Sequence, residues 1–135
     1  MKILIDTNIL VYAAGIRATE EKRRQAVDAL ASARPDACLA LQVLTEFSAV
    51  ALRNGMKPER CRAIVERYLR SWTVLLPSAR TLDGALRGVA EHRLSFFDSM
   101  LWALAVERGV REIWSEDGPS GATVGRVTYY NPFTS

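Results

Sequence analysis

Short apolar segments alternate along this chain with longer segments whose apolar residues recur at helical spacing. The first apolar segment is β-branched and ends at Asp6, which is typical of a buried strand. Strands are predicted at residues 2–5, 38–40, 72–76, 112–115 and 126–130. Helices are predicted at residues 8–14, 19–33, 42–54, 58–70 and 98–108, and from Ser78 or Thr81 to His92. This order predicts an α/β fold, a three-layer α/β/α sandwich with a mostly parallel central sheet.

The length and composition fit a single domain, residues 1–135. With 49% apolar and 24% charged residues, the chain is unlike disordered or disulfide-stapled proteins. No apolar run approaches the roughly 18–20 residues of a membrane helix, and no secretory leader precedes the first strand. We therefore expect the chain to stay in the cytoplasm, with Cys38 and Cys61 as reduced structural thiols.

Arginine dominates the basic residues, with 15 Arg against 3 Lys and a net charge of +3. Arg recognises phosphate through a planar, bidentate guanidinium, so this bias fits a nucleic-acid ligand. A GC-rich genome would produce the same bias through its codons. The charge alone therefore does not decide between the two explanations.

Four acids interrupt apolar surroundings, whereas most other acids lie among Arg and Lys as on solvated helix faces. The four are Asp6, Glu46, Asp98 and Asp117. Three of them are expected to end or follow strands, and the fourth, Glu46, to begin a helix just after one. Asp6 and Asp98 could also be helix caps and Asp117 a turn residue, but Glu46 caps nothing obvious. In a parallel sheet these positions are expected to converge on one edge.

Convergence of carboxylates needs compensation, because two of them about 5 Å apart repel by roughly 3 kcal/mol at an effective dielectric near 20. Either some carboxylates take up protons, or a divalent cation binds. Carboxylate and water oxygens suit Mg²⁺ or Mn²⁺, which can activate water for attack on a phosphodiester. The single His, His92, is expected on a solvated helix end, so a His-rich zinc site is excluded and a Ser-His-Asp triad is disfavoured.

Five sequence motifs, in order, resemble those of PIN-domain nucleases, and most closely the VapC-like toxins of bacterial toxin–antitoxin pairs. The motifs are Ile3-Leu4-Ile5-Asp6-Thr7-Asn8-Ile9-Leu10-Val11-Tyr12, Thr45-Glu46-Phe47, Leu94-Ser95-Phe96-Phe97-Asp98-Ser99-Met100-Leu101, Ser115-Glu116-Asp117 and Asn131-Pro132-Phe133. The resemblance spans nearly the whole chain, and four acidic motifs in this order and spacing are far more specific than a lone Asp-Thr-Asn.

The resemblance implies metal-dependent cleavage of RNA with Mg²⁺ or Mn²⁺ as cofactor. When the roles of the family's motif residues are transferred by position, Asp6, Asp98 and Asp117 are expected to be metal ligands. Glu46 is expected to contact the metal directly or through water. The resemblance also makes Thr7, Asn8 and Ser115 residues that position the motif or substrate. Family toxins usually form homodimers and are inhibited by a small antitoxin that commonly places a basic side chain in the acidic pocket.

One segment departs from the family pattern. After Asp117 the family usually has an apolar residue and a short loop ending in Gly, whereas here Gly118-Pro119-Ser120-Gly121 follows. Whether the Asp117 side chain points into the site is therefore open, and Glu116 is the alternative candidate for the fourth acid.

Two other functions remain as hypotheses. The first is a catalytically inactive PIN-like module that only binds RNA or a partner, which the altered loop allows. The second is a phosphotransfer enzyme or receiver-like switch. A phosphatase of that kind would need a second Asp where Asn8 stands, and a receiver would need a late Lys, whereas the last Lys is Lys57.

Overall fold

The computed structural model describes residues 1–118 and 121–133. Within these residues the chain forms one six-stranded sheet in the order β3-β2-β1-β4-β6-β5. The strands are β1 (Ile3–Ile5), β2 (Ala37–Ala40), β3 (Thr73–Leu75), β4 (Glu112–Trp114), β5 (Thr123–Val124) and β6 (Val127–Tyr130). All neighbouring pairs are parallel except β5 with β6, so the predicted mostly parallel sheet is confirmed.

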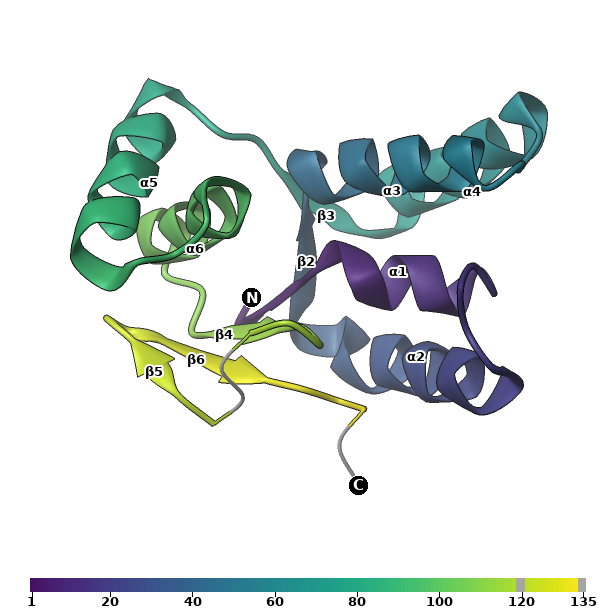
Figure 1. The fold of residues 1–135 in the computed structure, drawn as a ribbon, viewed down its shortest axis with the longest axis horizontal. Coiled ribbons are helices and arrows are strands. Elements are labelled where there is room, and N and C mark those ends of the chain that lie inside the picture. The colour runs from purple at the N-terminus through teal and green to yellow at the C-terminus, as the bar shows by residue number, and fades with distance from the viewer. Residues whose placement is uncertain (119–120, 134–135) are drawn as a thin grey trace.

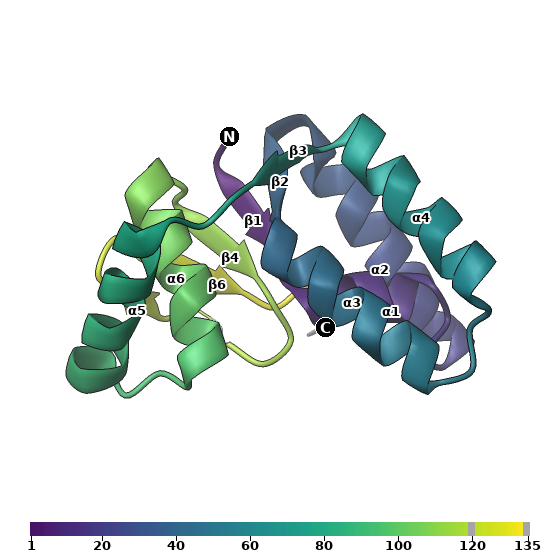
Figure 2. The same cartoon turned by 90° about the horizontal axis from the view of Figure 1, so that it is seen from above.

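Six α-helices in the described residues cover the sheet on both faces. They are α1 (Thr7–Ala13), α2 (Glu20–Ala33), α3 (Leu41–Arg53), α4 (Pro58–Ser71), α5 (Ala79–His92) and α6 (Phe96–Arg108), with a short 3-10 turn η1 (Arg34–Asp36) before β2. Helices α1 to α4 lie on one side of the sheet and α5 and α6 on the other (Figures 1 and 2). The three-layer α/β/α prediction is therefore confirmed.

Local signals explain most helix boundaries. Asp6 caps α1 and Thr19 caps α2, each accepting a hydrogen bond from a backbone N–H of the first turn. Pro58 occupies the first turn of α4, where its missing N–H costs nothing, and Ser78 forms a capping box at the start of α5. The predicted boundaries agree within one or two residues, but the two-residue β5 was not predicted.

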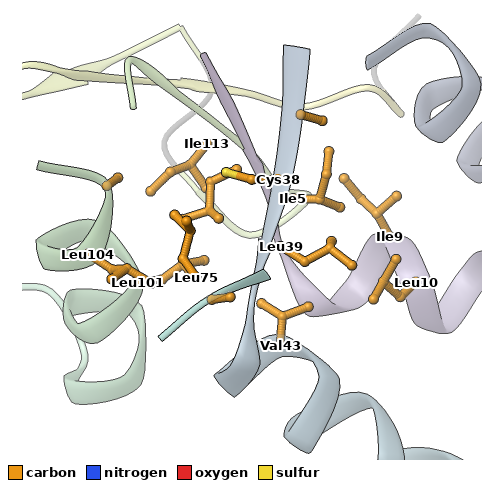
Figure 3. Packing of buried hydrophobic residues seen from close by; sticks show 14 of the residues in the cluster. Ile5, Ile9, Leu10, Cys38, Leu39, Val43, Leu75, Leu101, Leu104 and Ile113 are labelled. Atoms are coloured by element: carbon orange, nitrogen blue, oxygen red, sulfur yellow. The ribbon is translucent and has the colours of Figure 1, made fainter. Parts of the chain in front are cut away.

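The core is formed by apolar side chains from the sheet and from both helix layers. Leu4, Ile5 and Leu39 of the central strands are fully buried. Figure 3 shows Ile9, Leu10 and Val43 packed on one side of the strands, and Leu101 and Leu104 on the other. Cys38 and Cys61 are buried free thiols, as predicted for reduced structural cysteines.

At β1 the helices that connect the strands switch from one face of the sheet to the other. This switch point determines where the candidate site lies. β1 pairs with β2 on one side and with β4 on the other. The chain that leaves β1 and β2 enters α1 and α3, whereas the chain before β4 comes from α6 on the opposite face. Ligand crevices in open parallel sheets form at such a switch point, beyond the carboxyl ends of the strands.

Helices α5 and α6 approach closely at Gly88. A Cβ at this position would lie 2.3 Å from Ser99 Oγ and 2.9 Å from the Trp102 ring. Ser99 Oγ also donates a 2.6 Å hydrogen bond to the carbonyl of Ala85, so it has little freedom to move away. The small residue at position 88 therefore sets how α6 packs.

We expect Gly88→Ala to lower the free energy of unfolding by about 1–3 kcal/mol, because overpacking outweighs the better helix propensity of Ala. Urea unfolding measures the effect. Gly84→Ala is the matched control, since its Cβ would meet Ala103 Cβ at 3.3 Å. Equal stabilities for the two variants would contradict the close packing of α5 and α6 at Gly88.

Candidate active site

Asp6 lies at the carboxyl end of β1, where the strand turns directly into α1. Its backbone N–H donates to the carbonyl of Trp114 on β4 at 2.9 Å, which holds the residue at the sheet edge. Its carboxylate accepts two short hydrogen bonds, from the Thr7 N–H to Oδ1 at 2.7 Å and from Ser115 Oγ to Oδ2 at 2.7 Å. The capping role and a site role are therefore compatible, because one carboxylate serves both.

The environment of Asp6 favours its neutral form. Burial raises the pKa of this carboxyl to about 6, even though the hydrogen bonds from Ser115 and Thr7 oppose the rise. The negative charges of Asp98 and Glu46 raise the pKa further. The predicted crowding of carboxylates is therefore visible in the electrostatics of Asp6.

A hydrogen-bond network joins α1 to the segment after β4. Asn8 Nδ2 donates to Asp117 Oδ2 at 3.1 Å, and Asn8 Oδ1 accepts from the Glu116 N–H at 3.3 Å. Ser115 Oγ accepts from the Asp117 N–H at 3.1 Å. Asn8 and Ser115 thus hold the Asp117 segment beside Asp6.

Glu46 reaches the same place from α3. Its Oε1 accepts hydrogen bonds from Thr7 Oγ1 at 3.0 Å and from Gln42 Nε2 at 3.2 Å. Gln42 Nε2 also donates to the carbonyl of Phe97 at 3.0 Å, so it connects α3 with the start of α6. Glu46 is half-buried, one turn of helix beyond Gln42.

Asp98 joins the site by a route that the sequence interpretation misplaced. We expected three of the acids to end or follow strands, but Asp98 lies in the first turn of α6, which follows α5. Ser95 occupies the N-cap, so Asp98 does not cap the helix. The α5–α6 pair packs on the sheet and brings this exposed carboxylate to the carboxyl edge.

Two cavities meet at these acids. A cavity of about 240 Å³ on the α1 and α3 side is lined by Asp6, Glu46, Asp98 and Asp117. A second cavity of about 160 Å³ on the α6 side is lined by Asp6, Asp98, Ser115 and Asp117. Two larger hollows elsewhere on the surface are lined by apolar side chains and arginines, with no carboxylate among their lining residues. The structure therefore brings all four predicted acids to one place.

Glu116, the substitute for the fourth acid, is engaged elsewhere. Its carboxylate accepts a hydrogen bond from Tyr12 Oη at 2.5 Å and forms an ion pair with Lys22 Nζ. Burial alone would raise the pKa of Glu116, but the hydrogen bonds from Lys22 and Tyr12 lower it below its ordinary value. Lys22 also lies over the rings of Tyr12 and Phe133. This geometry favours Asp117 over Glu116 as the fourth acid of the pocket.

The donor chemistry of the pocket fits a hard divalent cation, although a complete ligand set is not assembled. Among residues 1–118 and 121–133, no three His, Cys, Asp or Glu side chains stand close enough to hold a metal. Asp6, Asp98 and Asp117 nonetheless line a common cavity, and the last two are exposed. Carboxylate oxygens with room for water are the ligands that Mg²⁺ and Mn²⁺ prefer.

Sequence reasoning missed three residues that border the pocket. Gln42 was not distinguished from an ordinary polar residue on a helix. Arg93 was one of many arginines, and its left-handed backbone, with φ of 57°, is visible only in the structure. Tyr129 alternates with Val127 on the buried face of its strand, so its position indicated only a core residue. His92, predicted on a solvated helix end, is exposed and packs its ring edge-on against Trp102.

A family model for the PIN domain matches residues 3–118. The chain belongs to the PIN domain family. The matched region contains all four acids and the hydrogen-bond network around them, so the family resemblance stated from the motifs is confirmed. No curated protein sequence matches the chain significantly.

Solved structures share this PIN-domain fold over nearly the whole chain. A chain of a toxin–antitoxin complex from Klebsiella pneumoniae aligns with a TM-score of 0.75 at 20% identity, covering 98% of each chain. VapC20 of Mycobacterium tuberculosis, a sarcin-ricin loop cleaving toxin, aligns with a TM-score of 0.72 at 20% identity over 87% of this chain and 92% of its own. VapBC2 from Rickettsia felis, bound to a promoter DNA fragment, aligns with a TM-score of 0.71 at 16% identity, covering 97% of this chain and 98% of its own. At these identities the likeness establishes the fold.

No helix in the described part of this PIN domain combines the length and the apolar character that a membrane crossing requires.

Proposed function

We propose that this PIN domain is a metal-dependent ribonuclease that hydrolyses RNA phosphodiester bonds. The observation that carries the proposal is the meeting of Asp6, Asp98 and Asp117 in one cavity at the carboxyl edge of the parallel strands. The charges of Asp98 and Glu46 add to burial in raising the pKa of Asp6, which supports the proposal, since a bound cation would relieve this repulsion. The family supports it as well, because PIN domains are generally nucleases.

In this proposal Asp6, Asp98 and Asp117 hold Mg²⁺ or Mn²⁺, and Glu46 contacts the ion directly or through water. When bound, the ion supplies an activated water and neutralises charge on the phosphodiester. Ser115 and Thr7 fix the orientation of the Asp6 carboxylate, and Asn8 fixes that of Asp117. Glu46 is oriented by Thr7 and Gln42, so within the described part of the chain each acid except Asp98 has a hydrogen-bond partner.

The proposal includes a role as the toxin of a toxin–antitoxin pair. Three structures with this fold are described as toxin–antitoxin or VapBC complexes, which supports a cognate antitoxin as the partner. An Arg side chain of the antitoxin in the acidic pocket would be favourable because its positive charge, like that of a cation, relieves the repulsion between the carboxylates. We further propose that the chain forms one domain over residues 1–135, acts as a homodimer and works in the cytoplasm, where its RNA substrate is found.

We expect purified protein to cleave single-stranded or looped RNA in the presence of Mn²⁺ or Mg²⁺ and to lose this activity in EDTA. Gel analysis of a labelled RNA pool measures the cleavage, and excess Mn²⁺ added after EDTA should restore it. An Asp6→Asn variant purified in the same way controls for contaminating ribonucleases. This preparation should not cleave the RNA.

The same assay separates the inactive-module hypothesis from the nuclease. RNA binding without cleavage at any metal concentration would support the module and overturn the enzyme. Cleavage that persists at full rate in EDTA would also contradict the proposal, because the acids would then have no metal-dependent role.

A further inference from the structure

Tyr129 has a buried hydroxyl that nothing in the described residues satisfies. The residue is 5% exposed, and its Oη has no hydrogen-bond partner within residues 1–118 and 121–133. A buried hydroxyl without a partner loses the hydrogen bonds that it makes to water in the unfolded chain, so such groups usually serve a ligand, an ion or an ordered water. The described residues therefore leave this hydroxyl available to a partner that they do not supply.

The Tyr129 side chain faces the acidic pocket from its sheet side. It lies opposite Ile113 in the β4–β6 register, and both residues line the cavity on the α6 side together with Asp6 and Asp98. Burial raises the pKa of Tyr129, and the charges of Asp98 and Asp6 raise it further, which agrees with this placement. The hydroxyl therefore stays protonated and can donate a hydrogen bond.

Close packing fixes the ring of Tyr129 in this orientation. A Cβ on Gly118 would lie 2.3 Å from Tyr129 Cδ2, so the absence of a side chain at position 118 makes room for the ring. The Tyr129 N–H donates a hydrogen bond to the carbonyl of Ala122, and the Tyr129 carbonyl accepts one from the Gly121 N–H, both at 2.9 Å. A rigid ring with a free hydroxyl is suited to positioning a ligand, because little freedom is lost on binding.

The same cavity is lined by further hydrogen-bond donors. Arg93 lines the cavity but has no ion-pair partner among the described residues, although three carboxylates line it as well. Its backbone is held in the left-handed region, with φ of 57°, at the end of α5. Strained positions of this kind cluster at functional sites. The Ser95 hydroxyl lines the cavity too and makes no capping hydrogen bond.

We propose that the cavity on the α6 side is a phosphate subsite, in which Tyr129 and Arg93 bind a phosphate of the RNA strand adjacent to the bond that is cut. Hydroxyl and guanidinium donors that line one cavity suit an anionic oxygen, and phosphate takes the largest share of such contacts in nucleic-acid complexes. The inference rests on the proposed ribonuclease function and deepens it, since it fixes where the strand runs beside the acids.

The test uses Tyr129→Phe, which removes only the hydroxyl, and Tyr130→Phe as the matched control. Tyr130 is 47% exposed and packs its ring against Trp114, away from the cavity. RNA binding is measured by fluorescence anisotropy with a short labelled single-stranded RNA, in the cleavage-silent Asp6→Asn background without metal. Under these conditions a bound ion cannot contribute to the difference.

We expect Tyr129→Phe to weaken RNA binding roughly tenfold or more, which corresponds to one hydrogen bond to a charged group. Tyr130→Phe should leave the binding unchanged, and both variants should melt within a few degrees of the parent. Arg93→Gln should weaken binding as well, whereas Arg80→Gln, at the other end of α5, should not. A purely structural role for Tyr129 would instead lower the melting temperature and leave RNA affinity intact.

Three results would overturn the inference. Equal RNA affinity of Tyr129→Phe and Tyr130→Phe, while wild type cleaves RNA, would remove the phosphate subsite and leave the ribonuclease standing. A calorimetric loss of Mn²⁺ affinity in Tyr129→Phe, with RNA binding preserved, would assign the hydroxyl to the ion instead. If the wild type neither binds nor cleaves RNA, the ribonuclease proposal and the subsite both fail.

Discussion

Replacing Asp98 by Asn is expected to lower the rate of Mn²⁺-dependent RNA cleavage by roughly a hundredfold to a thousandfold, the range seen when one preorganised electrostatic group is removed from a site. In our proposal Asp98 is a metal ligand, and it is the only one of the four acids that has no hydrogen-bond partner among the described residues. Its charge is therefore available to a ligand. Single-turnover cleavage of a labelled RNA measures the change.

The fold should tolerate this substitution. Asp98 is exposed in the first turn of α6, so Asn loses only a favourable interaction with the helix dipole, about 0.3–1 kcal/mol. Asp28→Asn is the matched control, because Asp28 is an exposed acid on α2, on the other face of the sheet. Full activity of Asp98→Asn, or an equal loss in Asp28→Asn, would contradict the assignment of Asp98.

The second large effect concerns stability without metal. Because burial and neighbouring charges raise the pKa of Asp6 to about 6 from an ordinary 3.8, the folded state binds a proton more tightly than the unfolded state. The contribution of Asp6 to stability is therefore fully present below the ordinary pKa and is lost as pH rises through about 6. A shift of this size corresponds to about 2–3 kcal/mol at most.

Comparison with Asp6→Asn isolates this contribution, because other titrating groups are shared by the two chains. Asn can still accept the Thr7 N–H, so the cap of α1 is preserved. We expect Asp6→Asn to be at least as stable as wild type near neutral pH without metal, and wild type to gain about 2–3 kcal/mol relative to it as pH falls to about 4. Urea unfolding at a series of pH values measures the difference. A pH-independent deficit of Asp6→Asn would mean that the carboxylate is purely structural.

Much of the fold followed from the sequence because its signals are local. Asp6 after an apolar strand, Thr19 and Pro58 at helix starts, and Gly109 at the end of α6 each act on neighbouring backbone groups. The parallel sheet followed from the alternation of elements. The two-residue β5 has no such signal, since it forms only by pairing with β6.

The site was predictable only in part. Carboxylates in apolar surroundings identified which acids to consider, but not how Asp98 reaches the others, because that depends on the packing of α5 and α6 on the sheet. The choice between Glu116 and Asp117 was open because consecutive residues after a strand point in different directions. The structure separates them, with Glu116 held by Lys22 and Asp117 beside Asn8. The predicted metal-binding and catalytic roles remain predictions.

The central claim is that Asp6, Asp98 and Asp117 share one divalent ion. Anomalous diffraction from a crystal of the wild-type chain grown with Mn²⁺ tests it most directly. We expect an anomalous peak at the carboxyl edge of β1 and β4, with oxygens of these three side chains or their bound waters as its ligands, and no peak there in Asp6→Asn. A wild-type crystal with Mn²⁺ bound elsewhere, and with no ion between these carboxylates, would contradict it.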